Sequence, residues 1–294
     1  MHLPVMFREV LHYLQLSEGL SVMDGTVGAA GHSQKILERL GSNGRLFGFD
    51  RDPMMLNHAR QKITQKSDST NVQLFHSSYA DAAEVFSEHG IDSVDRVLLD
   101  LGLSSDQLAD RERGFGFDAG GALDMRFDTS RGHSAEDLIR TADRQQLESI
   151  FTDFGEENFA RQIAAQICQQ RSRQPIQTTE DLEACVMAAI PRASRRGRNP
   201  ATRVFQALRI SVNDELEHVQ RMMTTVLPAI LKPNGIAVIL TFHSLEDRIV
   251  KSAFKGHKEW QVLTKTPIES TPAEIRLNPR SRSARLRAAV RRNL

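Results

Sequence analysis

Four short apolar runs in the first hundred residues alternate with stretches that have helical spacing. The runs are Leu20–Met23, Arg45–Phe49, Val72–Phe75 and Val94–Leu99. Strands separated by helices in this way predict a doubly wound α/β fold with a parallel sheet. Ligands of such sheets bind at the carboxyl ends of the strands. The residues at or just beyond these ends, which we expect to line a site, are Asp24, Asp50, Tyr79 and Asp100.

The strand pattern stops after about residue 105 and resumes only near residue 231. Between these points the sequence favours helices, with capping boxes at Ser134–Asp137 and Thr178–Asp181 and no convincing strand. Further strands are expected at Ile236–Thr241, Trp260–Lys265 and Ala284–Val290. The simplest organisation is an α/β domain of residues 1–105 and 201–294, interrupted by a helical insertion of residues 106–200 that would recognise a substrate such as RNA.

Charge is unevenly distributed along a chain whose formal net charge is only +1. Six arginines and no acid lie between Arg192 and Arg209, and seven arginines and no acid follow from Arg276 to the end. Such blocks suggest local contacts with a polyanion, although either one alone is equally consistent with a solvated face. With no apolar run of about 20 residues, no signal-like N-terminus and only two cysteines, we expect a cytosolic protein without a membrane span or a metal site.

The glycine-rich turn "VMDGTVGAAGH" at residues 22–32 narrows the choice of ligand. Its glycines are spaced three apart, which is not the dinucleotide pattern, and no P-loop lysine follows. Acids at two neighbouring strand ends would repel a pyrophosphate. S-adenosylmethionine fits better, because Asp50 could pair with its ribose hydroxyls. The structural alternatives are that Asp24 forms the turn and that Asp50 caps the helix that begins near Pro53.

Eight strings in order resemble the ribosomal RNA small subunit methyltransferase H family, also called MraW. They are "HLPVM", "DGTVGAAGHS", "FDRDP", "LLDLGLSSDQL", "RGFGF", "GALDMRFD", "NPATRVFQALRISVNDEL" and "TFHSLEDRIVK". The resemblance continues to the C-terminal "NPRSRSARLR" and so spans nearly the whole chain. It implies a class I, Rossmann-like fold, S-adenosylmethionine as cofactor, and an activity of EC class 2.1.1. The substrate it implies is the exocyclic N4 of a cytidine in the decoding region of 16S rRNA, in the small ribosomal subunit. A homodimer is left open.

The resemblance also assigns individual residues. The implied cofactor contacts are Ala30, Gly31, His32, Asp50, Tyr79, Asp100 and Gln107. The implied substrate residues include Asp124 and Arg126, within "GALDMRFD". Where this chain has Ala30 the family usually has glycine, and the added Cβ disfavours a positive φ. We nevertheless expect the cofactor site to survive this change.

Methyl transfer to a cytosine amine requires help for a poor, ring-conjugated nucleophile. A hydrogen-bond acceptor beside the amine would stabilise the pyramidal transition state. "DLGLSS" at residues 100–105 lies where amino-methyltransferases carry such an acceptor, so Asp100 is the first catalytic candidate, with Ser104 nearby. In "TFHSLEDRIVK", His243 is the second, as a proton acceptor, while Ser244 and Arg248 would contact the RNA. Ser244 with Asp247 also reads as an ordinary helix cap.

Two other function classes remain on the sequence alone. A dehydrogenase on a dinucleotide fold is disfavoured by the glycine spacing and the arginine blocks. An RNA-binding ribosome-assembly factor with a relic cofactor fold is supported only by Ala30. "RGFGF" matches the start of an RRM signature, but Asp118 and the residues after it break the match. We expect that loop to pack in a core.

Overall fold

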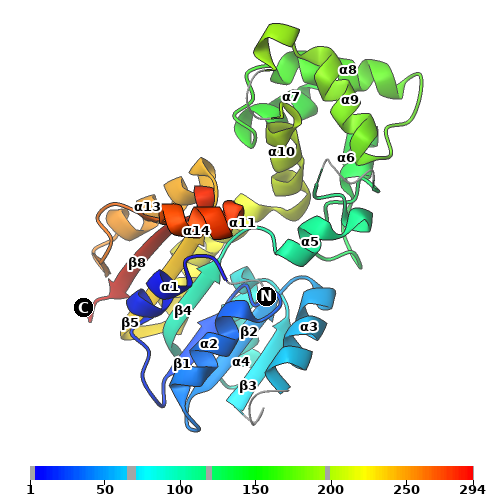
Figure 1. The fold of residues 1–294 in the computed structure, drawn as a ribbon. Helices are drawn as coiled ribbons and strands as arrows, with labels where there is room; N and C mark the ends of the chain where they lie inside the picture. The colour runs from blue at the N-terminus through cyan, green and yellow to red at the C-terminus, as the bar shows by residue number, and fades with distance from the viewer. Residues whose placement is uncertain (1–3, 65–70, 117–120, 196–198, 294) are drawn as a thin grey trace. The chain divides into compact units, whose positions relative to one another are not determined.

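The computed structural model describes residues 4–64, 71–116, 121–195 and 199–293. The chain forms two compact units (Figure 1). One comprises Met1–Gly102 with Leu216–Leu294, and the other is Leu103–Glu215. The first junction lies within three residues of the expected boundary at residue 105, whereas the boundary expected at residue 200 is wrong by fifteen residues.

A mixed sheet forms the centre of the first unit. Its strands are β1 (Ser21–Asp24), β2 (Arg45–Asp50), β3 (Val72–His76), β4 (Val94–Asp100), β5 (Leu231–Thr241), β6 (Trp260–Val262), β7 (Ile268–Glu269) and β8 (Arg285–Arg291). The order is β3-β2-β1-β4-β5-β8-β6, with β7 also paired to β8. The first five strands are parallel, and β8 is antiparallel to its three neighbours. The strands expected near Trp260 and Ala284 therefore form, but they add an antiparallel edge.

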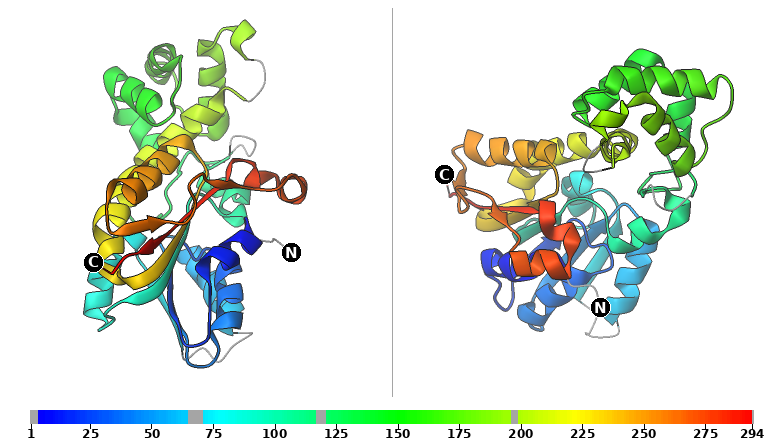
Figure 2. Two further views of the ribbon diagram at one scale, coloured as in Figure 1. Left: turned by 90° about the vertical axis from the view of Figure 1, so that its left-hand side faces the viewer. Right: turned by 45° about the horizontal axis from the view of Figure 1, so that its top comes forward.

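Helices cover both faces of this sheet, which confirms the doubly wound α/β fold (Figure 2). One face carries α4 (Ala82–Glu88), α13 (Ser244–Gly256) and the continuous helix formed by α11 (Glu215–Arg221), a π-helical turn and α12 (Leu227–Ile230). The other carries α1 (Phe7–Leu14) and α2 (Gly31–Leu40), with α3 (Pro53–Thr64) packed beside α2. Side chains along β4 point alternately to the two faces, so both faces can bury apolar residues. Val97 and Leu99 pack on the first face and Leu98 on the second.

The sheet order reverses between β1 and β4, which pair with each other while their crossover helices lead in opposite directions. This is the topological switch point at which doubly wound sheets bind their ligands. Because β1, β2 and β4 are parallel, their final residues, Asp24, Asp50 and Asp100, all lie at the same edge.

The second unit is helical and has a hydrophobic core of its own. Its helices are α5 (Ser105–Ala109), α6 (Ala135–Thr141), α7 (Arg144–Asp153), α8 (Ala160–Arg171), α9 (Thr179–Ala189) and α10 (Ala201–Asn213). Both expected capping boxes form, at Ser134 and Thr178. Among its described residues, strand-like pairing is limited to one bridge between Ala122 and Thr178.

Helix α10 explains the misplaced boundary. Its apolar side chains, including Val204, Phe205 and Leu208, are buried in the core of the helical unit together with Leu147 and Phe151 of α7. The spacing of these residues predicts an amphipathic helix but does not say which core its apolar face joins. The sequence also gave no prediction of α1 or of the two-residue strand β7. In the described part of the chain, no helix combines the length and the apolar character needed to cross a membrane.

Candidate active site

Asp24, at the end of β1, holds the glycine-rich turn together. Its carboxylate accepts hydrogen bonds from the Ser33 hydroxyl (2.6 Å) and from the backbone N–H of Thr26 (3.2 Å). Asp24 is 1% exposed, and this burial raises its pKa above the usual value for an aspartate. Of the two roles expected for Asp24, lining a site or forming the turn, the structure shows the turn-forming one.

The turn itself brings the backbone unusually close to its neighbours. A Cβ at Gly25 would collide with the side chain of Leu99 and lie 2.9 Å from Cβ of Tyr79. Ala30, the residue before α2, has φ of 62°, so the left-handed backbone anticipated from the sequence is present. Its methyl group is buried beside Val27 and Ala59. That contact offsets part of the roughly 1–2 kcal/mol that a left-handed conformation costs an alanine.

Asp50, at the end of β2, faces the same turn. Its Oδ2 accepts from the backbone N–H of Gly28 (2.8 Å), and its Oδ1 accepts from that of Asp52 (2.9 Å). Burial raises the pKa of Asp50 to about 6. Asp52, rather than Asp50, caps α3, because Asp52 accepts from the N–H of Met54 (2.9 Å). Each carboxylate oxygen of Asp50 keeps capacity for one further donor.

His32, which is buried, and Asp100, which is partly exposed, form a pair at the switch point. Nε2 of His32 lies 3.4 Å from Oδ2 of Asp100, and the backbone N–H of Asp100 donates to the Thr26 hydroxyl (2.7 Å). Within the described residues, neither ring nitrogen of His32 nor Oδ1 of Asp100 has a hydrogen-bond partner. Buried polar groups are nearly always satisfied, so these atoms indicate a polar ligand at this place.

Tyr79 follows β3 in a short helical turn and lies beside residues that the sequence did not single out. The Ser78 hydroxyl accepts from the N–H of Ala80 (3.1 Å) and thereby fixes this turn. His218 of α11 contacts Tyr79 edge to face, with ring centroids 6.4 Å apart. Its Nδ1 lies 3.1 Å from Nη1 of Arg51. Because a guanidinium only donates, Nδ1 of His218 accepts, and its other nitrogen carries the ring proton.

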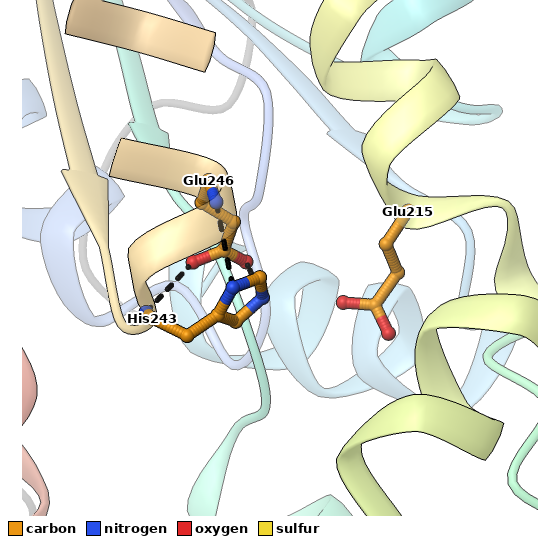
Figure 3. Close-up of side chains that lie close together, drawn as sticks. All are labelled: Glu215, His243 and Glu246. Atoms are coloured by element: carbon orange, nitrogen blue, oxygen red, sulfur yellow. Dashed lines mark hydrogen bonds and ion pairs between the residues drawn. The ribbon is translucent and has the colours of Figure 1, made fainter. Parts of the chain in front are cut away.

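His243 caps helix α13, a role that the sequence reasoning gave to Ser244. Figure 3 shows its imidazole against the carboxylate of Glu246. Nδ1 of His243 accepts from the backbone N–H of Glu246 (3.4 Å), and Oε2 of Glu246 accepts from the N–H of Phe242 (2.7 Å) and of His243 (3.3 Å). The histidine therefore accepts from the first turn of the helix, while Glu246 accepts from the N–H groups just ahead of it. With Nδ1 used in this way, the neutral ring carries its proton on Nε2, 3.1 Å from Oε1 of Glu246. Proton transfer by His243 stays a prediction.

Comparison with known proteins identifies the family. A family model described as "MraW methylase family" matches residues 1–292. The chain belongs to the MraW methylase family. A protein named ribosomal RNA small subunit methyltransferase H from Geotalea uraniireducens is 41% identical over 307 residues, covering 98% of this chain and 97% of the relative. One of the same name from Pseudothermotoga lettingae is 41% identical and covers 99% of both chains. A solved rRNA methylase from Streptococcus thermophilus is 7% identical, with a TM-score of 0.44 over 100% of both chains.

The remaining predicted residues of this MraW methylase fall in two places. Ser244 and Arg248 are exposed on the first two turns of α13. The others lie in the helical unit, where Ser104 and Gln107 form the reciprocal capping box of α5. Also in that unit, Asp124 and Arg126 form a charge-assisted pair, with Nη2 of Arg126 2.6 Å from Oδ2 of Asp124. The structure therefore shows that these four residues in the helical unit stabilise local geometry, and any contact with cofactor or substrate stays a prediction.

The "RGFGF" segment has the core-packing role expected for it. Phe115 is 7% exposed and stacks on Phe127, with centroids 5.6 Å apart, while the guanidinium of Arg113 lies over its ring. Phe117 lies outside the described residues. The residues that sequence reasoning missed at the sheet edge are Thr26, Ser33, Arg51 and His218. Only Thr26 carried a usable signal, since it lies inside the glycine-rich turn.

Proposed function

We propose that this MraW methylase transfers a methyl group from S-adenosylmethionine to the exocyclic N4 of a cytidine in the decoding region of 16S rRNA. The observation that carries the proposal is the His32–Asp100 pair at the switch point, which lies beside the carboxylate of Asp50 and has polar atoms without a partner among the described residues. The names of the relatives support rRNA of the small subunit as the substrate. A substrate of that kind places the reaction in the cytoplasm, and the proposal requires no dimer.

The residues at this edge suit S-adenosylmethionine better than a dinucleotide. Asp50 would accept hydrogen bonds from ribose hydroxyls, and a pyrophosphate would meet the carboxylates of Asp24 and Asp50. Tyr79 follows β3, the strand beside β2, in a short helical turn. The bound cofactor supplies an electrophilic methyl group on a sulfonium sulfur.

Asp100 has the central chemical role among the residues of this chain. Its Oδ1, which has no partner among the described residues, would accept a hydrogen from the cytosine amine. That contact favours the pyramidal nitrogen of the transition state over the planar ground state. His32 orients the carboxylate through its contact with Oδ2, and the Thr26 hydroxyl fixes the backbone.

Calorimetry and methyl labelling test the proposal together. Titration should show binding of S-adenosylmethionine and none of NADH. Incubation with S-adenosylmethionine labelled in its methyl group and unmodified small subunits should then label 16S rRNA. Binding of NADH alone would favour the dehydrogenase. RNA binding with no affinity for either small molecule would favour the assembly factor with a relic fold.

Replacing Asp50 with alanine should weaken binding of S-adenosylmethionine by about 1.5–3 kcal/mol, because charge-assisted hydrogen bonds to the ribose are lost. The ionised carboxylate is the better acceptor, so affinity in the native protein should fall as the pH drops through about 6. Calorimetry between pH 5 and 8 measures both effects. A folded Asp50→Ala variant with native affinity would remove the ribose assignment.

The raised pKa of Asp50 also predicts the pH dependence of folding in the absence of cofactor. The native group binds a proton more tightly than the unfolded one. Its contribution to stability is therefore complete below 3.8, the ordinary pKa of an aspartate, and is lost as the pH rises through the native pKa of about 6. The Asp50→Asn variant, which cannot ionise, should lack this component. Urea unfolding of both proteins from pH 4 to 7 compares them.

Replacing Arg192, Arg195, Arg196 and Arg198 with glutamine should weaken RNA binding while leaving the affinity for S-adenosylmethionine unchanged. Arg196 and Arg198 lie outside the described residues, whereas Nε of Arg195 donates to the carbonyl of Ile190 (2.9 Å). Binding weakens with salt, and each lost phosphate contact with single-stranded RNA should make the slope of log K against log salt shallower by about 0.7. Filter binding at several salt concentrations measures that slope. If slope and affinity are native, this block is a solvated face.

A further inference from the structure

Some arginines of the C-terminal block lie in β8 and are bonded to its neighbours, and others are exposed. Arg287 is buried and forms two hydrogen bonds with Asp247, Arg285 lies 3.5 Å from the same carboxylate, and Arg291 donates to a backbone carbonyl. These arginines hold β8 in the fold. Three exposed members precede β8, in α14 (Pro272–Leu277) and the helical turn Pro279–Ser283; they are Arg276, Arg280 and Arg282. A fourth exposed member, Arg292, follows β8 and lies at the other end of that strand.

Leu277 lies between these arginines and is 82% exposed. Among the described residues it is the large hydrophobic side chain that stands out as exposed. A single exposed leucine needs no explanation by itself. Here it shares one short segment with three exposed cations, and no acidic residue follows Glu274 in the chain. The segment combines positive charge with an apolar contact.

This segment, residues 271–283, is built into the fold and is not a loose tail. The Thr271 hydroxyl accepts from the N–H of Glu274 (3.2 Å) and caps α14. Ser281 is fully buried and donates to the carbonyl of Asn278 (2.8 Å). Oε1 of Glu274 accepts from the N–H of Met6 (2.5 Å), which ties α14 to the N-terminal segment. The arginines therefore extend from a fixed backbone.

The topology places the segment at the edge that carries the candidate active site. It enters β8 at Arg285, which pairs with Thr241 at the carboxyl end of β5. The N-terminal segment to which α14 is tied reaches the same edge, because Pro4 lies against Gly31 at the start of α2. Figure 2 shows α14 next to the N-terminal segment. A strand of nucleic acid bound at this edge would contact both the candidate active site and residues 271–283.

We infer that residues 271–283 form an RNA-docking surface of the methyltransferase unit itself, separate from the helical unit. This inference rests on the proposed function. Guanidinium groups bind phosphates through paired, charge-assisted hydrogen bonds. Leu277 offers an apolar surface to the face of an unstacked base, and unstacked bases are what proteins read in single-stranded RNA. The surface guides the strand toward Asp100.

The test compares two triple variants that remove the same charge. The first is R276Q/R280Q/R282Q. The control is R39Q/R60Q/K62Q, whose residues are exposed near the ends of α2 and α3. Both helices start at the carboxyl edge and run back toward the start of the next strand, so the control residues lie near the opposite edge. Fluorescence anisotropy with a labelled single-stranded fragment of small-subunit rRNA, at 0.05–0.4 M salt, measures binding.

The first variant should lower the slope of log K against log salt by about 2 and weaken binding about 100-fold at 0.1 M salt, from three lost phosphate contacts. The control should bind like the native protein. Leu277→Ser should weaken binding about 5-fold with an unchanged slope, because an apolar contact releases no counterions. Affinity for S-adenosylmethionine, measured by calorimetry, should stay native in all three.

Other outcomes overturn the inference. A native slope in R276Q/R280Q/R282Q, while native protein still methylates rRNA, rejects the surface and leaves the proposed function standing. Failure of the native protein to bind or label RNA at all rejects the proposed function instead. Weaker binding of whole small subunits with native binding of the RNA fragment would mean that the surface contacts protein. Loss of a dimer in Leu277→Ser, seen by sedimentation, would mean that it contacts a second copy.

Discussion

Asp100→Asn is expected to slow methyl transfer about 100- to 1000-fold in single-turnover experiments, the range seen when one preorganised transition-state contact is removed. Asparagine has the same shape as aspartate and can still contact His32. The hydrogen bond from residue 100 to the Thr26 hydroxyl comes from the backbone N–H, so it should remain. The loss falls on the acceptor, because the neutral amide oxygen stabilises a developing positive charge on nitrogen far less than a carboxylate does. Rapid-quench assays with saturating RNA isolate this step.

A matched variant separates chemistry from folding. Asp92→Asn also removes one negative charge but lies exposed just before β4, at the other end of the strand. It should leave the single-turnover rate native, and both variants should unfold within about 1 kcal/mol of the native protein. If Asp100→Asn transfers methyl groups at the native rate from bound RNA, Asp100 has no chemical role.

The second large effect concerns stability. Asp247→Ala should lower the free energy of unfolding by about 3–5 kcal/mol, because it leaves the buried guanidinium of Arg287 without its counter-ion. In the native protein the two residues form hydrogen bonds of 2.6 and 3.0 Å that join α13 to β8. Lys251→Gln, at an exposed position on the same helix, should change stability by less than about 0.5 kcal/mol. Urea denaturation measures all of these variants.

A double variant shows whether the loss of stability comes from the unpaired charge of Arg287 or from lost packing. Asp247→Leu with Arg287→Met removes both charges, and the double variant should recover a large part of the loss of the single one. A cost below 1 kcal/mol for Asp247→Ala would show that the pair contributes little. A double variant no more stable than the single one would show that packing, and not the unpaired charge, is responsible.

The local sequence pattern was enough to predict most of the α/β unit. The apolar runs predicted its strands to within a few residues, and an acid at the end of β1, β2 and β4 marked the edge that carries the candidate active site. Parallel strands bring such ends together whatever the details of packing, so this inference needed no tertiary information. The glycine-rich turn was recognised from its own residues, whereas the strain at Ala30 was anticipated only from the glycine that the family usually has there.

What the sequence did not show depends on contacts between distant residues. Arg287 looked like one more member of a basic block, because its partner lies 40 positions away in a different element. Asp247 looked like the partner of a Ser244 cap, although the cap is His243 with Glu246. The boundary expected at residue 200 cut off α10, because only the packing of its apolar side chains shows that it joins the helical unit. His218 gave no signal, since its role arises from its position beside Arg51 and Tyr79.

Nucleoside analysis of labelled rRNA shows which atom of which nucleoside receives the methyl group. Unmodified small subunits are incubated with the protein and S-adenosylmethionine labelled in its methyl group, and the 16S rRNA is then digested to nucleosides. We expect label in N4-methylated cytidine from the decoding region. After an equally short incubation with the Asp100→Asn variant, we expect no label. Label confined to another nucleoside, or to another position of cytidine, would contradict the proposed function.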